Sequence, residues 1–169
     1  MLLAGTSRGV FRIEADGADA GSTCVLESRG VRDLIRLGHH VFAGTGAGLY
    51  RSSDDGATWE LVGMADREVW QTRAGGGALY AGTQPAGLFR SDDEGATWSE
   101  VTSFAALPEA AQWCIPLDPP VPGRARALVV DPDDADRLWV GVEVNAPLRR
   151  LGQGGERRDL GPGGTLVVG

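Results

Sequence analysis

The sequence predicts an all-β protein: an antiparallel β-propeller of four-stranded blades, of which about 3.5 to 4 are present. The first observation is an internal repeat, because 41–62 (VFAGTGAGLYRSSDDGATWELV) and 79–101 (LYAGTQPAGLFRSDDEGATWSEV) share one pattern. The second is that short apolar runs alternate with glycine-rich turns, which is typical of strands. The third is that the first copy along the chain lacks a first strand. A ring that closes by pairing the chain ends explains this gap, whereas a linear β-solenoid does not.

The two best copies each predict four strands. We expect the strands of unit 2, 31–62, at 31–37, 41–45, 49–52 and 58–62. We expect those of unit 3, 67–101, at 69–74, 79–83, 88–91 and 97–101. Sheets of this kind cannot bury their own apolar faces, so the units must stack on one another.

The outer units are incomplete. Unit 1, 2–27, predicts strands at 2–6, 9–13 and 22–27, which match the second, third and fourth strands of the repeat. Unit 4 begins at 124 and predicts a first strand at 125–131 and a second at 137–144. A proline-rich insertion, 102–123, separates units 3 and 4 and contains the one expected helix, around 107–112. The blades therefore cover 1–144.

The tail, 145–169, departs from the repeat. It is rich in Gly and Arg where a third strand, a turn and a fourth strand are expected. All 16 basic residues of the chain are Arg, and Ala and Gly are abundant, which is typical of GC-rich genes. We therefore interpret the tail as the product of a frameshift or another truncating event in a partial propeller, whose open strand edges would let two copies pair. The alternative is a small four-bladed ring in which 165–168 supplies the strand that unit 1 lacks.

The most specific motif occurs in the turn between the third and fourth strands. Its residues are Ser52, Asp54, Gly56, Thr58 and Trp59 in unit 2, and Ser91, Asp93, Gly95, Thr97 and Trp98 in unit 3. These turns resemble the Asp-box of the BNR (bacterial neuraminidase) repeat, and the fuller pattern is similar to propeller proteins described as sialidase-like or glycosyl hydrolase-like. The resemblance covers residues 1 to 144 and is strongest in the two repeated segments. It implies a BNR/Asp-box propeller.

The motif residues suit a structural turn. An Asp side chain accepts backbone N–H groups across a turn, and Gly adopts positive φ without steric cost. Ser and Thr hydroxyls bond within the turn, while Trp covers the hairpin. A cation site at 54–55 and 92–94 is the alternative interpretation. In propellers this turn lies opposite the mouth, where ligands usually bind, so we expect no catalytic role for it.

The mouth is expected at the loops between second and third strands, with the insertion beside it and the first strands lining the channel. The candidate ligand-binding residues there are Arg8, Arg32, Asp33, Trp70, Gln71, Trp113 and Arg126. Such a set suits a polar, anionic ligand. The competing interpretation is that the tryptophans pack and the arginines pair with neighbouring carboxylates.

The leading functional hypothesis is a non-catalytic propeller that binds a small polar ligand, a glycan or a protein through its mouth. A sialidase-like glycoside hydrolase is the second, and an assembly or scaffold factor the third.

A sialidase needs three arginines, a Tyr nucleophile polarised by Glu, and an Asp acid/base. This set is an exception to the paired carboxylates of most glycosidases. The two tyrosines, Tyr50 and Tyr80, occupy repeated strand positions and are expected in the core. We identify no catalytic set and expect no cofactor.

Composition narrows the partners. A net charge of −7 argues against nucleic acid, which needs a basic face. The chain contains no apolar run of about 20 residues, so no membrane partner is expected. No basic region opens the N-terminus, so we expect no signal peptide and a cytoplasmic protein, with Cys24 and Cys114 as inert thiols. His39 and His40 are adjacent on an extended chain and point apart, so no metal site is expected.

Overall fold

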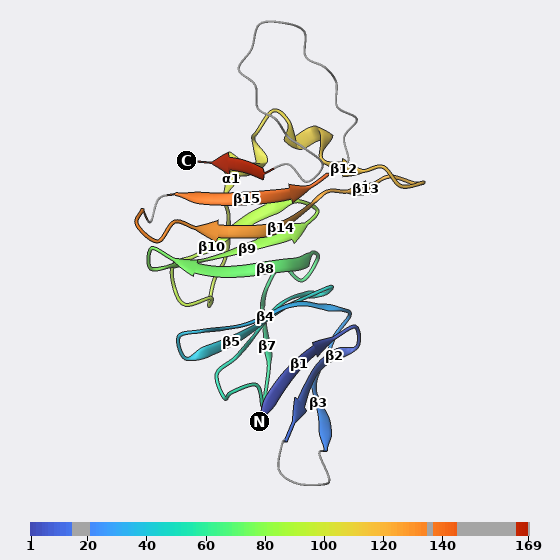
Figure 1. Ribbon diagram of the computed structural model, residues 1–169, viewed down its shortest axis with the longest axis vertical. Helices are drawn as coiled ribbons and strands as arrows, with labels where there is room; N and C mark the ends of the chain where they lie inside the picture. The colour runs from blue at the N-terminus through green and yellow to red at the C-terminus, as the bar shows by residue number, and fades with distance from the viewer. Residues whose placement is uncertain (15–20, 135–136, 145–164, 169) are drawn as a thin grey trace, which may run out of the picture.

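In the described part of the chain, four antiparallel sheets of three or four strands are stacked in chain order and a fifth has two strands, as the computed structural model shows (Figure 1). The structure describes residues 1–14, 21–134, 137–144 and 165–168. The sheet that contains the N-terminus lies at one end of the stack and the sheet that contains the last strand lies at the other. The all-β, antiparallel prediction is confirmed, while the arrangement of these sheets as propeller blades stays a prediction.

Sheet 1 contains three strands in the order β1-β2-β3. They are β1 (Leu2–Thr6), β2 (Gly9–Ile13) and β3 (Ser22–Glu27), at the predicted positions. Strand β1 pairs with β2 from Leu2 opposite Ile13 to Thr6 opposite Gly9. Among the described strands, none pairs with the other edge of β1.

Sheets 2 and 3 are four-stranded meanders of the same topology, so the repeated sequences fold alike. Sheet 2 contains β4 (Val31–Leu37), β5 (His40–Thr45), β6 (Gly48–Ser52) and β7 (Glu60–Gly63). Sheet 3 contains β8 (Glu68–Gly75), β9 (Ala78–Gln84), β10 (Gly87–Ser91) and β11 (Ser99–Glu100). The strands begin and end within two residues of the predicted bounds, except that β11 is shorter.

The insertion between sheets 3 and 4 contains little regular structure. It forms α1 (Thr102–Ala105), a single 3-10 turn (Ala110–Gln112), β12 (Cys114–Ile115) and β13 (Val121–Pro122). The helix expected around 107–112 is therefore wrong except for its last three residues. Pro108 disfavours helical geometry at Leu107, which separates the two short helical segments. The hairpin of β12 and β13 projects from the side of the stack (Figure 1).

Sheet 4 contains β14 (Arg124–Val130), β15 (Leu138–Glu143) and β16 (Thr165–Val168), in that order. Strand β16 pairs with β15, from Leu138 opposite Val168 to Gly141 opposite Thr165. The alternative in which 165–168 completes unit 1 is therefore wrong. The segment instead covers the edge of β15 that the missing third strand would leave open, in the same sheet as its neighbour in the chain. The rest of the predicted aberrant tail, 145–164 and 169, lies outside the described residues.

Among the described residues, three apolar clusters form the core, one between each pair of successive sheets. Between sheets 1 and 2 the buried members are Val10, Leu26 and Ala43. Between sheets 2 and 3 they are Phe42, Leu49, Met64, Val69 and Ala81. Between sheets 3 and 4 the cluster includes Tyr80, Leu88, Phe104, Leu128 and Val140. Each sheet thus depends on its neighbours to bury its faces.

The glycines of the repeated Ala-Gly-Thr segments allow this stacking. A Cβ on Gly44 would lie 2.8 Å from the carbonyl oxygen of Val69, in the first strand of the next sheet. A Cβ on Gly82 would lie 2.4 Å from the carbonyl oxygen of Ala125. Because real Cβ atoms do not approach oxygen so closely, only glycine lets the next first strand pack at this distance.

No helix in the described part of the chain has the length and apolar character needed to cross a lipid bilayer.

The replacement Gly82→Ala should lower the free energy of unfolding by about 1–3 kcal/mol, because the added methyl group forces sheets 3 and 4 apart. Urea unfolding measures the loss. Gly21→Ala is the matched control, since a Cβ there meets nothing within 4 Å, and it should leave stability unchanged. Equal stability of the two variants would contradict the packing argument.

Candidate functional site

The connections between strands form two sets at opposite ends of the sheets. In sheet 2, the turn between β4 and β5 lies at the same end as the motif turn between β6 and β7, as antiparallel order requires. Arg36 of β4 pairs with Asp55 of the motif turn at 2.6 Å, and Ser53 Oγ lies 3.1 Å from His40 Nδ1. The loop between β5 and β6, one of the predicted mouth loops, lies at the other end. We call the two ends the box end and the loop end.

The motif turn of sheet 2 is closed by its own side chains. Asp54 Oδ1 accepts the Ser52 hydroxyl and the Thr58 backbone N–H, both at 2.8 Å, and Oδ2 accepts the Thr58 hydroxyl at 2.7 Å. The Gly56 N–H donates to Ser52 Oγ at 2.8 Å, with φ of Gly56 at 83°. The indole of Trp59 donates to the Gly56 carbonyl at 3.1 Å. All five motif side chains and backbone groups therefore act inside one turn.

The turn of sheet 3 has the same geometry. Asp93 accepts the Ser91 hydroxyl and the Thr97 N–H at 2.8 Å each, and the Thr97 hydroxyl at 2.6 Å. The Gly95 N–H donates to Ser91 Oγ at 2.9 Å, and Trp98 donates to the Gly95 carbonyl at 3.2 Å. The oxygens of Asp93 are thus used by donors of the turn itself, which leaves Asp93, like Asp54, unsuited to bind a metal ion.

Each motif turn also packs on the preceding sheet. A Cβ on Gly56 would lie 2.5 Å from Leu3 Cδ1 in sheet 1, and one on Gly95 would lie 2.6 Å from Phe42 Cε1 in sheet 2. Trp98 lies against Gly63 of β7 in the preceding sheet. The turns consequently join neighbouring sheets at the box end.

Hydrogen bonding stabilises the charged form of both aspartates. The Thr58 backbone N–H, followed by the Thr58 hydroxyl, lowers the pKa of Asp54 from 3.8 to about 2. The Thr97 hydroxyl, followed by the Thr97 N–H, lowers the pKa of Asp93 from 3.8 to about 2. Among the described residues, no group of three His, Cys, Asp or Glu side chains is arranged to hold a metal ion.

Three of the predicted ligand-binding residues occupy equivalent positions in the first strands. The ladders of β4, β8 and β14 are each interrupted by a bulge at the same place. The bulged residues are Arg32, Trp70 and Arg126. A bulge re-aims the side chain of the extra residue, and here it gives three neighbouring strands the same local geometry.

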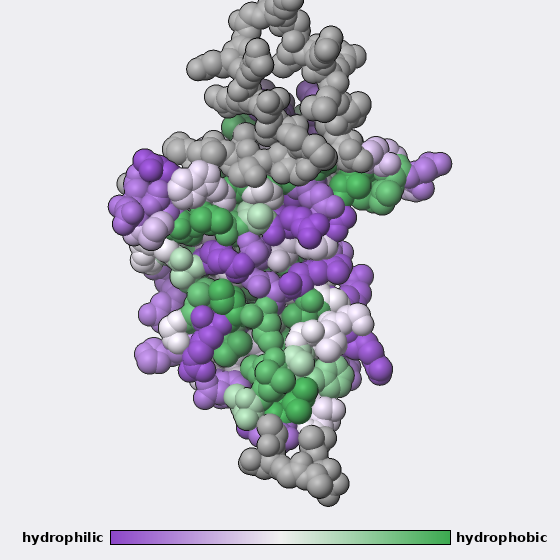
Figure 2. Space-filling view, viewed as in Figure 1, coloured by the Kyte–Doolittle hydropathy of each residue, from purple (hydrophilic) through white to green (hydrophobic). Residues whose placement is uncertain are grey.

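These bulged side chains meet around the ring of Trp70. The guanidinium carbon of Arg32 lies 4.5 Å from the ring centroid, and that of Arg126 lies 5.8 Å away. A third guanidinium, that of Arg124, lies at 4.5 Å. We call Arg32, Trp70, Arg124 and Arg126 the Arg–Trp cluster. Figure 2 shows hydrophilic residues gathered over β8 and β14, in the middle of the visible face.

Two carboxylates complete the surroundings of the Arg–Trp cluster. Glu68 pairs with Arg32 at 3.0 Å, and Glu143 pairs with Arg126 at 2.8 Å and with Arg124 at 3.2 Å. Three guanidinium groups therefore face two carboxylates. The side chains of Arg126 and Arg32 are 54% and 37% exposed, so both remain accessible from solvent.

Asp33 and Gln71 link successive first strands. Asp33 Oδ2 accepts the backbone N–H of Thr72 at 2.7 Å and pairs with Arg73 at 3.2 Å. At the equivalent position of the next sheet, the Gln71 amide oxygen accepts the backbone N–H of Leu128. Each side chain thus accepts a hydrogen bond from a backbone N–H of the first strand of the next sheet. That N–H points away from the strands of its own sheet.

Two other predicted residues lie apart from the Arg–Trp cluster. Arg8 belongs to the loop between β1 and β2, where its backbone N–H donates to Thr6 Oγ1 at 3.1 Å. Trp113 packs against Phe104, with ring centroids 4.9 Å apart, at the edge of the core cluster between sheets 3 and 4. The structure therefore brings together Arg32, Trp70 and Arg126.

Sequence reasoning missed Arg124, Glu68 and Glu143. Arg124 and Glu68 each stand two residues before the bulged residue of their strand, so the alignment of first strands carried a usable signal for both. Glu143 lies opposite Arg124 in the ladder of sheet 4, which depends on the register of β14 with β15.

The two tyrosines are core residues. Tyr80 is 7% exposed, and the guanidinium of Arg90 lies 5.8 Å from its ring centroid. Tyr50 packs against the cluster between sheets 1 and 2. Neither ring contacts the Arg–Trp cluster among the described residues.

Comparison with known proteins identifies no family: no family model matches the chain, and no curated protein matches it.

The depressed pKa values predict an acid-dependent loss of stability. The two aspartates contribute stability that is complete above the unfolded pKa of 3.8 and is lost as the pH falls through about 2. The midpoint of urea unfolding, followed from pH 6 to pH 2, should fall more steeply at the acid end in the parent protein than in the double variant Asp54→Asn, Asp93→Asn. Asp66→Asn, an exposed change outside the two motif turns, should retain the parent slope. The idea fails if all three proteins show the same slope.

Proposed function

We propose that the protein is a non-catalytic BNR/Asp-box propeller that binds a polar ligand with an anionic group through the mouth of its channel. The main observation in support of a binding site is the Arg–Trp cluster, in which three guanidinium groups from two sheets surround the ring of Trp70. The partner is a small molecule or a glycan with a carboxylate, phosphate or sulfate group.

Three features support the propeller assignment. The repeated sheets share one topology, the first strand of each of sheets 2 to 4 packs on a glycine of the preceding sheet, and two motif turns bridge successive sheets. All three are expected of propeller blades, which bury their faces only against each other. The same order places the first strands side by side, with their bulged residues along a common line.

The charge of the Arg–Trp cluster supports an anionic ligand. Its three guanidinium groups outnumber the two carboxylates that pair with them. Arginine binds carboxylate and phosphate groups through two parallel N–H donors. The ring of Trp70 holds the guanidiniums in place by cation–π attraction. Its indole N–H is buried and, among the described residues, has no hydrogen-bond acceptor, so a bound acceptor would satisfy it.

A sialidase-like glycoside hydrolase is the second candidate, because three arginines gather at one place. Their geometry favours binding over hydrolysis: all three lie against the ring of Trp70 and pair with Glu68 or Glu143. The tyrosines that such an enzyme would use as nucleophile lie in the apolar clusters.

Binding is tested by titrating the protein with glucuronate and with glucose, following the indole N–H resonance of Trp70 by NMR. The proposal predicts a saturable shift with glucuronate and an affinity for glucose at least about tenfold weaker, since one charge-assisted hydrogen bond is worth about that factor. Sugar phosphates and sugar sulfates can be titrated in the same way.

Measured by isothermal titration calorimetry, glucuronate binding should weaken at least about tenfold in each of the variants Arg126→Ala and Trp70→Ala. Arg12→Ala, which removes an arginine paired with Glu14 in sheet 1, should leave it unchanged. Equal affinity for charged and neutral sugars would contradict the binding proposal. Hydrolysis of chromogenic glycosides that is lost in Arg126→Ala would establish the enzyme instead.

A further inference from the structure

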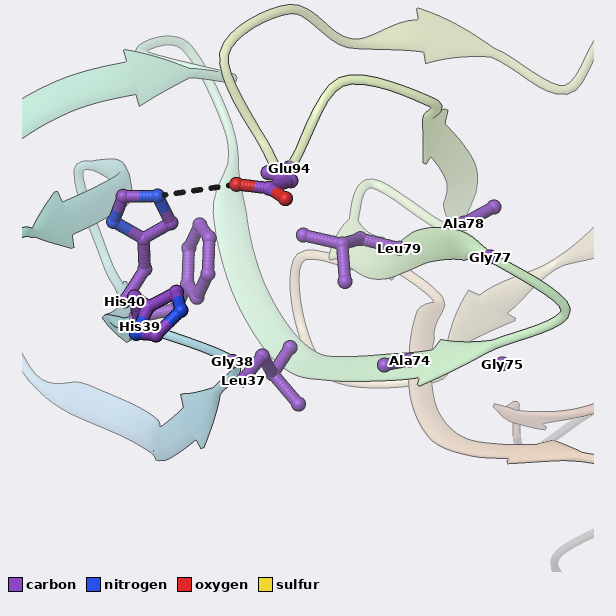
Figure 3. Close-up of a pocket in the computed structure, with 11 residues that line it drawn as sticks. Leu37, Gly38, His39, His40, Ala74, Gly75, Gly77, Ala78, Leu79 and Glu94 are labelled. Carbon is purple, nitrogen blue, oxygen red and sulfur yellow. Dashed lines mark ion pairs between the residues drawn. The ribbon is translucent and has the colours of Figure 1, made fainter.

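A pocket of about 380 Å³ opens at the box end, between sheets 2 and 3 (Figure 3). Its sides come from three connections: the turn between β4 and β5, the turn between β8 and β9, and the motif turn of sheet 3. Leu37 and Leu79 point toward one another across it, while His40 and Glu94 face each other at its rim. The pocket lies at the opposite end of the sheets from the mouth loops.

The equivalent position in sheet 2 shows which group can pair with the carboxylate of a motif turn. Arg36 lies opposite Val41 in the ladder of β4 and β5. Its guanidinium pairs at 2.6 Å with Asp55, the residue that precedes Gly56 in the motif turn. A cation on a strand thus meets a carboxylate on the turn of the same sheet.

Sheet 3 keeps the acid of this pair and lacks the cation. Ala74 lies opposite Leu79 in the ladder of β8 and β9, which is the position of Arg36. Glu94 precedes Gly95, which is the position of Asp55. Both Ala74 and Glu94 line the pocket. The substitution of Ala for Arg therefore leaves space beside a carboxylate.

Within the described chain, the one ion-pair partner of the Glu94 carboxylate is His40, at 3.6 Å. The Glu94 side chain is 83% exposed. Arg51 donates to the backbone carbonyl of Glu94 at 3.3 Å, but its charge is paired with Glu60 at 2.7 Å. The carboxylate is consequently available to a cation.

We propose that this pocket binds a guanidinium group on an apolar stem, in the place that Arg36 takes in sheet 2. The guanidinium pairs with the carboxylate of Glu94 through charge-assisted hydrogen bonds. The methylenes of the stem lie against Leu37, Leu79 and Ala74, as arginine stems commonly lie along apolar surface while the guanidinium stays in solvent. His39 and His40 form the polar side of the opening.

Two sources could supply this group, a free alkylguanidinium compound or an arginine side chain of a polypeptide. The probes are butylguanidinium, its neutral isostere butylurea, and the peptide acetyl-Ala-Arg-Ala-amide. Binding is followed by the ring C–H resonances of His40 in the full chain. Butylguanidinium should bind saturably and about threefold more tightly than butylurea, because the Glu94 carboxylate is exposed and solvent weakens its ion pairs.

The variants separate this pocket from general charge attraction. Glu94→Gln should weaken butylguanidinium binding about threefold, and Ala74→Arg should abolish it because the chain then fills the pocket itself. Asp55→Asn is the matched control, since it removes the equivalent acid in sheet 2, and binding should persist.

Tighter binding of the peptide than of butylguanidinium assigns the pocket to a polypeptide arginine, and the reverse assigns it to a free small molecule. Equal shifts with butylguanidinium and butylurea, or no effect of Glu94→Gln, would overturn the proposal. The variant Trp70→Ala should leave this binding intact, so its outcome is independent of the function proposed for the Arg–Trp cluster.

Discussion

The close approach of each first strand to a glycine of the preceding sheet is the constraint on which the rest of the structure depends. At Gly44 and Gly82 the backbone of the next sheet occupies the space that any side chain would need. This contact sets the distance between sheets, and that distance lets the apolar clusters close. It also brings each motif turn onto the preceding sheet, at Leu3 of β1 and at Phe42 of β5.

The contact between each first strand and a glycine of the preceding sheet also positions the Arg–Trp cluster and the pocket at Glu94. Val69 and Ala125, which pack on the glycines, stand immediately before the bulged residues Trp70 and Arg126. Stacking the strands therefore stacks the bulges, and the guanidiniums meet the indole ring as a consequence. At the other end, the motif turns carry Asp55 and Glu94 outward, where one meets an arginine of its own sheet and the other borders a pocket.

The repeat predicted most of the fold because the same pattern specifies the same hairpins each time. Strand positions in sheets 1 to 3 and the hydrogen bonds of Asp54 and Asp93 follow from residue types within one unit.

The insertion has no second copy to align with, so the repeat could not predict that its helix is interrupted at Pro108. Strand β16 is apolar, but composition alone does not choose which open edge it pairs with. The role of Glu143 depends on the register of β14 with β15, which adjacent sequence does not encode. The pocket at Glu94 depends on a difference between repeats, Ala74 for Arg36, whose consequence appears only once the sheets are stacked.

Native-state hydrogen exchange of Gly44→Ala tests the central claim that the sheets stabilise one another through these glycines. If they do, the amides of β5, which contains the substitution, and of β8, in the next sheet, lose protection together and by a similar factor. Loss of protection confined to β5, with β8 unchanged, would contradict the account.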